Sequence, residues 1–229
     1  MEHLHTVEKS NVIHTLKDPG SAISHFIGMI LWIIGSFPLV TKAIHTKDTI
    51  SILSIIIFCI SLILLYFAST LYHSVIANSK TEQRLKKLDH MAIYVLIAGT
   101  YTPMCTLVLG RPQGMIMLVV IWSIALLGIV LTSFWVNSPK WLNSTIYVLM
   151  GWTVILEIKP LYHALASSSL FWLFLGGIIY TIGGIIYALK PVSFNERHPY
   201  FGTHEIFHVL CILGSLCHYI LMLQLVVTM

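Results

Sequence analysis

Three short stretches of this sequence place histidine, serine and aspartate inside or beside strongly apolar segments. Ser69 and His73 end one apolar segment, Asp89 precedes another, and His204 and His208 begin the last one. Residues four apart lie on one face of a helix, so His204 and His208 can bind one ion together, and Ser69 shares the face of His73. Three imidazoles are a typical ligand set for a catalytic zinc with an open fourth position. Asp89 could then orient a water molecule or accept its proton.

The amino-acid composition indicates which class of secondary structure positions these residues. The chain has 229 residues, of which 57% are hydrophobic and 10% are charged, and its mean hydropathy is +0.86. Soluble domains carry about 25% charged residues, so this chain has too little polar surface to cover a water-soluble protein. Disorder is excluded as well, because disordered chains have low hydrophobicity. The composition therefore indicates an all-α membrane protein.

Seven apolar segments follow a polar stretch of about 20 residues. A helix that crosses a hydrocarbon core needs ~20 apolar residues, and we expect spans at 21–41, 50–75, 90–109, 114–136, 142–158, 169–189 and 203–227. The fifth span is the weakest, because its apolar stretch is short and Glu157 and Lys159 close it. The expected organisation is a cytoplasmic N-terminal tail at 1–20 and a single seven-helix domain at 21–229.

The distribution of basic residues predicts the orientation, because basic residues favour the cytoplasmic side. With seven spans, nine of the 13 lysines and arginines lie on the side of the N-terminal tail. The four on the other side are Lys42, Lys47, Arg111 and Lys159. We therefore expect the N-terminus in the cytoplasm and the C-terminus outside. This topology brings His73, Asp89 and His204 to one level near the cytoplasmic face, whereas six spans would separate them.

The net charge limits the classes of binding partner, and the positions of the cysteines indicate their role in packing. The net charge is +4 with scattered basic residues, so we expect no nucleic-acid partner. A pocket between apolar helices would instead admit membrane lipids as substrate or ligand. The cysteines lie inside apolar segments without CxxC pairs and are interpreted as small hydrophobic residues of the bundle: Cys59, Cys105, Cys211 and Cys217.

The same histidines have a second interpretation, in which they make structural polar contacts between helices. Spacing and topology alone leave both interpretations open. His25 could support the site or pack between helices, and His218 could line a polar track or be an ordinary buried histidine. His90 is expected to face another helix or the interface, because it points about 100° away from Asp89. Glu205 is expected to point toward lipid headgroups or a basic residue.

Taken together, the motifs resemble the hemolysin III branch of the progestin and adipoQ receptor (PAQR) group. That group stands within a wider set of seven-helix membrane proteins that includes alkaline ceramidases. The resemblance covers nearly the whole chain from about residue 20. The stretches that carry it are Ser24-His25, 66–73 (YFASTLYH), 88–103 (LDHMAIYVLIAGTYTP), 176–181 (GGIIYT) and 204–208 (HEIFH).

The resemblance implies roles for the polar residues. His73, His204 and His208 are implied as ligands of Zn²⁺, Asp89 as a contact to the metal through water, and Ser69 as support for the site. It also implies hydrolysis of a ceramide-like lipid amide. Asp89 and Ser69 are thus the expected catalytic residues.

Three functions remain open for this expected multi-pass protein of the cell membrane. The first is a zinc-dependent hydrolase that acts on a lipid amide or ester near the cytoplasmic face. The second is a pore-forming, cytolytic protein, as the hemolysin name suggests. Seven conventional spans without a charged ring argue against it. The third is a receptor or membrane-homeostasis sensor in which zinc is a structural staple.

Overall fold

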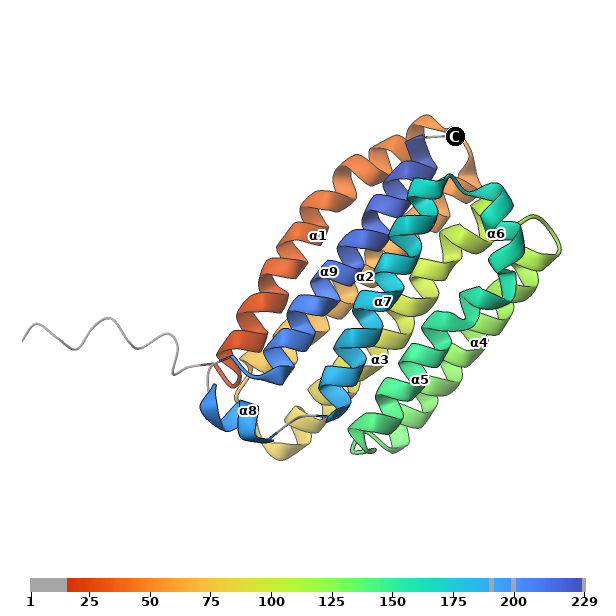
Figure 1. The fold of residues 1–229 in the computed structure, drawn as a ribbon. Helices are drawn as coiled ribbons and strands as arrows, with labels where there is room; N and C mark the ends of the chain where they lie inside the picture. The colour runs from red at the N-terminus through yellow and green to blue at the C-terminus, as the bar shows by residue number, and fades with distance from the viewer. Residues whose placement is uncertain (1–15, 190–191, 199–200, 228–229) are drawn as a thin grey trace, which may run out of the picture.

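The computed structural model describes residues 16–189, 192–198 and 201–227, and every regular element within these residues is a helix (Figure 1). Seven helical segments are long and apolar enough to cross a membrane, which confirms the predicted multi-pass bundle. Residues 1–15 of the predicted tail lie outside the described part. The seven segments are α1 (Pro19–His45), α2 (Thr49–Ser74), α3 with its π-helical end (Ser79–Val108), α4 (Gln113–Phe134), α5 to α6 (Lys140–Ala164), α7 (Ser167–Leu189) and α9 (Thr203–Val227).

The third helix begins at Ser79, well before the predicted residue 90. Its first turns are polar, and the hydropathy pattern therefore does not reveal them. The side chain of Asn78 caps the helix by accepting a hydrogen bond from the backbone N–H of Thr81 at 3.0 Å. Further along, Lys86 Nζ donates to Asn137 Oδ1 at 2.8 Å, and Lys87 Nζ donates to the carbonyl of Ser133 at 2.6 Å. These contacts hold the start of α3 against the end of α4.

The fifth segment, whose apolar stretch is short, is not one continuous α-helix. α5 (Lys140–Trp152) passes into a 3₁₀ turn (Thr153–Glu157) and then into the short α6 (Ile158–Ala164). Pro160 lacks the N–H that an unbroken α-helix would use there. The hydroxyl of Tyr101 on α3 occupies the interruption. It accepts from the Val154 N–H at 2.7 Å and donates to the Gly151 carbonyl at 2.6 Å.

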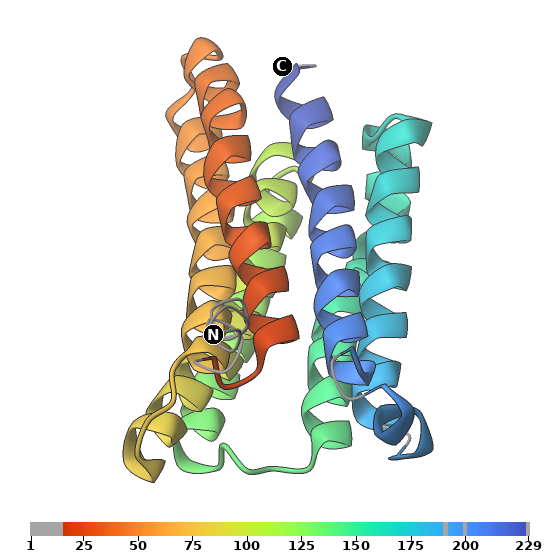
Figure 2. The ribbon, with the colours of Figure 1, turned by 90° about the vertical axis from the view of Figure 1, so that its left-hand side faces the viewer.

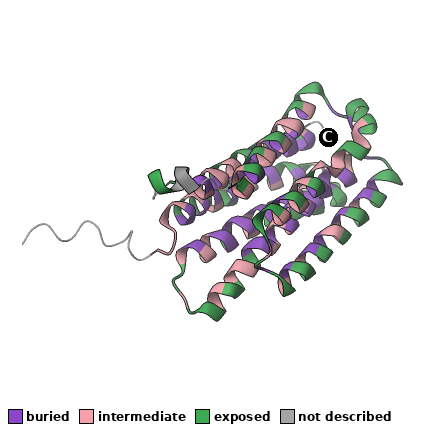
Figure 3. Ribbon diagram, turned by 60° about the horizontal axis from the view of Figure 1, so that its bottom comes forward, coloured by how far each residue is buried: buried purple, intermediate pink, exposed green. Residues whose placement is uncertain are grey.

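Small residues allow the helices to approach closely. A Cβ on Gly99 of α3 would lie 2.3 Å from Ser61 Oγ of α2, and a Cβ on Gly128 of α4 would lie 2.2 Å from the ring of Tyr94. Apolar side chains such as Phe37 (70% exposed) cover the outside, where lipid is the solvent. Figure 3 shows buried positions facing the interior of the bundle and exposed positions facing outward.

The order of the helices brings distant parts of the chain together. α9 (Thr203–Val227) packs between α1 and α7, although α1 and α9 are the first and last long helices (Figure 2). α1 begins, α2 ends and both α3 and α9 begin at the same end of the bundle (Figure 1). We call this the histidine end, defined by Asp18, His73, Asp89 and His204. The short α8 (Val192–Arg197) precedes α9 there.

Candidate metal centre

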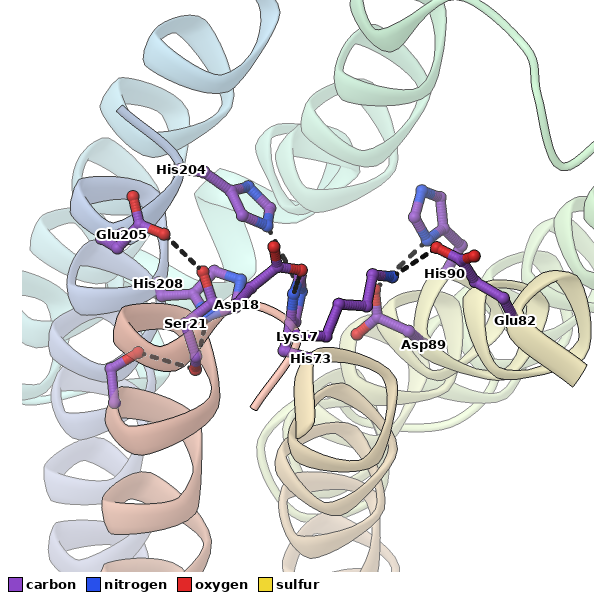
Figure 4. A network of polar contacts seen from close by, with 11 residues as sticks. Lys17, Asp18, Ser21, His73, Glu82, Asp89, His90, His204, Glu205 and His208 are labelled. Carbon is purple, nitrogen blue, oxygen red and sulfur yellow. Dashed lines mark hydrogen bonds and ion pairs between the residues drawn. The ribbon is translucent and has the colours of Figure 1, made fainter. Parts of the chain in front are cut away.

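The structure brings the three predicted ligands together. His73 lies on α2, and His204 and His208 lie on α9. Each offers one imidazole nitrogen, and these three nitrogens lie within 4.8 Å of one another. His73 Nε2 and His204 Nε2 are 3.3 Å apart. His73 and His208 are buried, and His204 is partly buried. The three side chains could therefore hold one metal ion, and Figure 4 shows the two histidines of α9 facing His73.

The donor set fits zinc in two respects. Two nitrogens bound at about 2.0–2.1 Å to one tetrahedral zinc lie ~3.3 Å apart, which is the observed separation of His73 Nε2 and His204 Nε2. Metal-binding histidines also commonly donate their other N–H to a carboxylate or carbonyl. His73 Nδ1 lies 2.8 Å from Asp18 Oδ2, and His208 Nδ1 lies 3.3 Å from the carbonyl of Ser21. Both contacts leave Nε2 as the ligand atom.

Asp18 and Ser21 are the residues of this centre that the sequence did not predict. Asp18 lies directly before α1, in the segment expected to be a tail, and its backbone N–H also donates to the carbonyl of His73 at 2.9 Å. The hydrogen bond from His73 holds the pKa of Asp18 below its usual range. The only local signal was an aspartate before Pro19, which is typical of an ordinary helix start.

Asp89 and Ser69, the predicted catalytic residues, line the same cavity as the three histidines. Both are buried, Ser69 on α2 one turn before His73, and Asp89 on α3. His90, which was expected to face another helix or the interface, is buried and lines the same cavity, with its Nδ1 3.3 Å from Asp89 Oδ2. The Tyr147 hydroxyl of α5 donates to the His90 carbonyl at 3.2 Å and tethers this turn of α3. The water-mediated contact between Asp89 and the metal stays a prediction.

Two further residues have defined places beside the centre. The ring of His25 on α1 stacks on that of His208, with centroids 3.7 Å apart and planes at 22°. Neither nitrogen of His25 has a hydrogen-bond partner in the part of the chain that the structure describes. Glu205 was expected to point toward lipid headgroups or a basic residue, but its carboxylate accepts from Ser21 Oγ and from the Gly202 N–H, both at 2.8 Å. It therefore joins α9 to α1.

A cavity of about 470 Å³ extends from the histidine cluster into the bundle. Its volume lies within the range of small-molecule pockets. Most of its wall is apolar, with Leu96, Ile97 and Phe174 among the lining residues. His218 also lines the cavity, and its ring stacks on Tyr180 with centroids 5.5 Å apart. Because His218 follows His208 by ten residues of helix, the cavity spans about 15 Å along α9.

Fold and site define the class: a multi-pass, seven-helix membrane protein with a buried histidine cluster that could hold a metal ion. The model of the haemolysin-III-related family matches residues 13–219, and the chain belongs to this family. The chain is 41% identical over 202 residues to the hemolysin-3 homolog of Bacillus subtilis (strain 168), which covers 88% of this chain and 91% of the relative. It is 36% identical over 199 residues to hemolysin-3 of Bacillus cereus, which covers 87% of each.

A more distant similarity reaches the receptor branch of the group. The adiponectin receptor protein of Drosophila melanogaster is 27% identical over an alignment of 229 residues, which covers 90% of this chain and 50% of the relative. The resemblance to hemolysin III and to the progestin and adipoQ receptors is thus confirmed.

Proposed function

We propose that the protein is a zinc-dependent hydrolase that cleaves an amide or ester bond of a membrane lipid at the histidine end. The observation that carries the proposal is the position of the three histidines at one end of an apolar cavity inside the bundle. When bound, zinc supplies a Lewis acid that polarises a carbonyl and lowers the pKa of a bound water to about 7.

The residues of the chain would bind the metal ion, bind the acyl chain and transfer the proton. His73, His204 and His208 hold the ion, and the apolar wall of the cavity binds the acyl chain away from water. Asp89 accepts a proton from the attacking water at a carboxylate oxygen and returns it to the leaving amine or alcohol. His90 Nδ1, 3.3 Å from that carboxylate, places a polar group beside it, and the Ser69 hydroxyl supports the polar end of the substrate. Cleavage thus yields a fatty acid and an amine or alcohol.

The mouth of the cavity supports a lipid with a polar headgroup. Lys86 and Lys140 line the cavity at the histidine end, together with Asn143. The Lys140 ammonium lies 4.5 Å from the ring centroid of Tyr187, whose ring centroid is 5.7 Å from that of His204. Cationic side chains so close to the metal centre are complementary to phosphate or carboxylate groups. The excess of basic residues on this side supports its placement at the cytoplasmic face.

A structural zinc is the second candidate, and the contacts of Asp18 and Ser21 favour it. Through these residues α1 is connected to both ligand-bearing helices, so one ion would staple α1, α2 and α9. In that case the protein would be a receptor or membrane-homeostasis sensor, as the similarity to adiponectin receptor protein suggests. Zinc would then contribute stability and no turnover.

The test combines metal analysis with lipid turnover. Purified protein is reconstituted with amide- and ester-linked lipids, and the released fatty acid is measured by mass spectrometry. We expect Asp89→Ala to retain about one zinc per chain and to lose roughly 10²–10⁴-fold of the turnover, because it removes the general base. His208→Ala should lose both zinc and turnover. His163→Ala, an exposed histidine of α6, should behave like the wild type.

Four results would contradict the proposal in different ways. Equal zinc in wild type and His208→Ala would remove the metal assignment. Unchanged turnover in Asp89→Ala would exclude Asp89 as the base. A wild type that binds zinc and hydrolyses none of the lipids, while His208→Ala loses only thermal stability, would favour the structural zinc. Dye release from liposomes that requires oligomerisation would instead favour the pore that the hemolysin name suggests.

A further inference from the structure

Residues 17–21 connect the start of α1 to both helices that carry the histidine ligands. Asp18 contacts His73 twice: its backbone N–H donates to the His73 carbonyl at 2.9 Å, and its Oδ2 lies 2.8 Å from His73 Nδ1. The carboxylate can only accept, so this contact places the proton of His73 on Nδ1. Nε2 then presents its lone pair to the other two histidines (Figure 4).

The carboxylate of Asp18 makes this contact instead of capping its own helix. Asp18 stands at the N-cap position of α1, where an aspartate ordinarily accepts a hydrogen bond from the second or third N–H of the helix. Among the described residues it makes no such side-chain bond to α1. Its side chain thus contacts His73, 55 residues further along the chain, instead of capping α1.

Ser21 makes the corresponding contacts to α9. Its carbonyl lies 3.3 Å from His208 Nδ1, and its hydroxyl donates to Glu205 Oε1 at 2.8 Å. The other oxygen of Glu205 accepts from the Gly202 N–H at 2.8 Å. Ser21 is fully buried, so water does not compete for these bonds. The start of α9, which carries two ligands, is therefore held against the start of α1.

Lys17 holds the same segment over the corner between α2 and α3. Its Nζ lies 2.7 Å from Glu82 Oε1 of α3 (Figure 4). The same Nζ lies 3.7 Å from the ring centroid of Tyr72, the residue directly before His73. The ion pair and the cation–π contact both favour one position of residue 17. The backbone of Asp18 is thereby held next to the end of α2.

We propose that residues 17–21 form a positioning strap that sets the metal affinity of the three-histidine centre, with Asp18 as the positioning residue of His73. The inference rests on the metal site proposed above and adds a determinant of its affinity. A carboxylate on the second nitrogen of a ligand histidine orients the ring and makes the ligand nitrogen more basic. Removing it leaves the three ligands in place but lowers their affinity for the ion.

The test measures zinc affinity by competition with a chromophoric chelator, using the full chain in detergent. Asp18→Ala should raise the dissociation constant for zinc roughly 10–100-fold. Asp18→Asn should have a smaller effect, because its amide oxygen still accepts from Nδ1 without the charge. Asp48→Ala is the matched control, since Asp48 is the N-cap of α2 and its side chain does bond to its own helix. It should leave the affinity unchanged.

A second readout separates positioning from general stability. Cobalt(II) in place of zinc reports ligand geometry in its visible spectrum, and we expect Asp18→Ala to shift this spectrum while Asp48→Ala leaves it unchanged. If Asp18→Ala does not fold, Asp18→Asn and Lys17→Ala carry the test, with an expected weakening of a few-fold each. Unchanged affinity in every folded strap variant would overturn the strap, as would equal weakening by Asp48→Ala. A wild type that binds no zinc would instead overturn the proposed function.

Discussion

Asp18 and Asp48 occupy the same position at the starts of two consecutive helices, and they are used differently. Asp48 caps α2 in the ordinary way: its carboxylate accepts from the Ser51 N–H at 2.8 Å and from the Ser51 hydroxyl at 2.6 Å. Asp18 leaves α1 without a side-chain cap in the described structure and contacts His73 instead. The same residue type before a helix therefore stabilises the helix at one end of the bundle and organises a site at the other.

The two ends differ in the range of their contacts. The side chain of Asp48 bonds only to residues up to three positions away in the described structure, and the Asp48 N–H donates to the hydroxyl of Thr46 two positions before it. At the histidine end the contacts of His73, His204 and His208 connect residues that are 55 to 187 positions apart. Local bonds stabilise one helix start, whereas these long-range bonds need the whole bundle to be assembled. The histidine end is thus the part of the molecule where the candidate metal site depends on the assembled fold.

The largest expected effect concerns the side of the membrane on which each end lies. Lys47 lies beside Asp48, Lys80 lies at the start of α3 near the histidine end, and both are exposed. With an N-terminus in the cytoplasm, Lys47→Cys should react with a membrane-impermeant maleimide on intact cells, whereas Lys80→Cys should react only after permeabilisation. The background is expected to be low, because the native cysteines of the described structure are all buried. The reverse labelling pattern would place the histidine end outside.

A smaller effect is expected from removing the metal. An ion that binds only the folded protein stabilises it by about 4 kcal/mol at 1,000 times its dissociation constant, so a strong chelator should lower the melting temperature of the wild type. His73→Ala should melt at the lower temperature with or without chelator. His45→Ala, an exposed histidine near Asp48, is the control and should keep the full response. A chelator response in His73→Ala would show that the ion binds elsewhere.

The smallest effect is expected at Asp48. Hydrogen bonds from the Ser51 hydroxyl and then from its N–H hold the pKa of Asp48 below its usual 3.8. A carboxyl group whose pKa is lowered by folding stabilises the protein above the unfolded pKa, and this stability is lost as the pH falls through the folded pKa. Asp48→Ala should therefore melt slightly below the wild type at pH 5–8, and the difference should vanish in acid. Thermal unfolding in detergent measures it, and a difference that grows in acid would contradict the assignment.

Much of the fold was predictable, because hydropathy and helical periodicity are properties of neighbouring residues. The seven spans and the common face of His204 and His208 followed from them. The polar beginning of α3 at Ser79 was missed, since hydropathy detects only the part of a helix that lies in lipid. The interruption after Trp152 was visible only as a short apolar stretch, because its partner, the Tyr101 hydroxyl, lies on another helix.

The histidine cluster was predictable from the sequence, whereas the residues that contact it were not. The odd number of spans placed His73 beside His204, and both histidines meet in the structure. Asp18 and Ser21 were assigned to a tail or a helix start, and Glu205 to headgroups or a basic residue. The local sequence does not reveal a hydrogen-bond partner that is distant along the chain.

By itself the sequence determined that this chain is a seven-helix membrane protein of the haemolysin-III-related family, with three histidines carried to one end of the bundle. Helix length, hydropathy and the parity of the crossings suffice for that. Only the tertiary structure decided that the Asp18 side chain contacts His73 instead of capping α1, and that a cavity of about 470 Å³ extends from the histidines. Both depend on how closely α1, α2 and α9 pack, because a hydrogen bond requires its two atoms within about 3 Å whatever their distance along the chain.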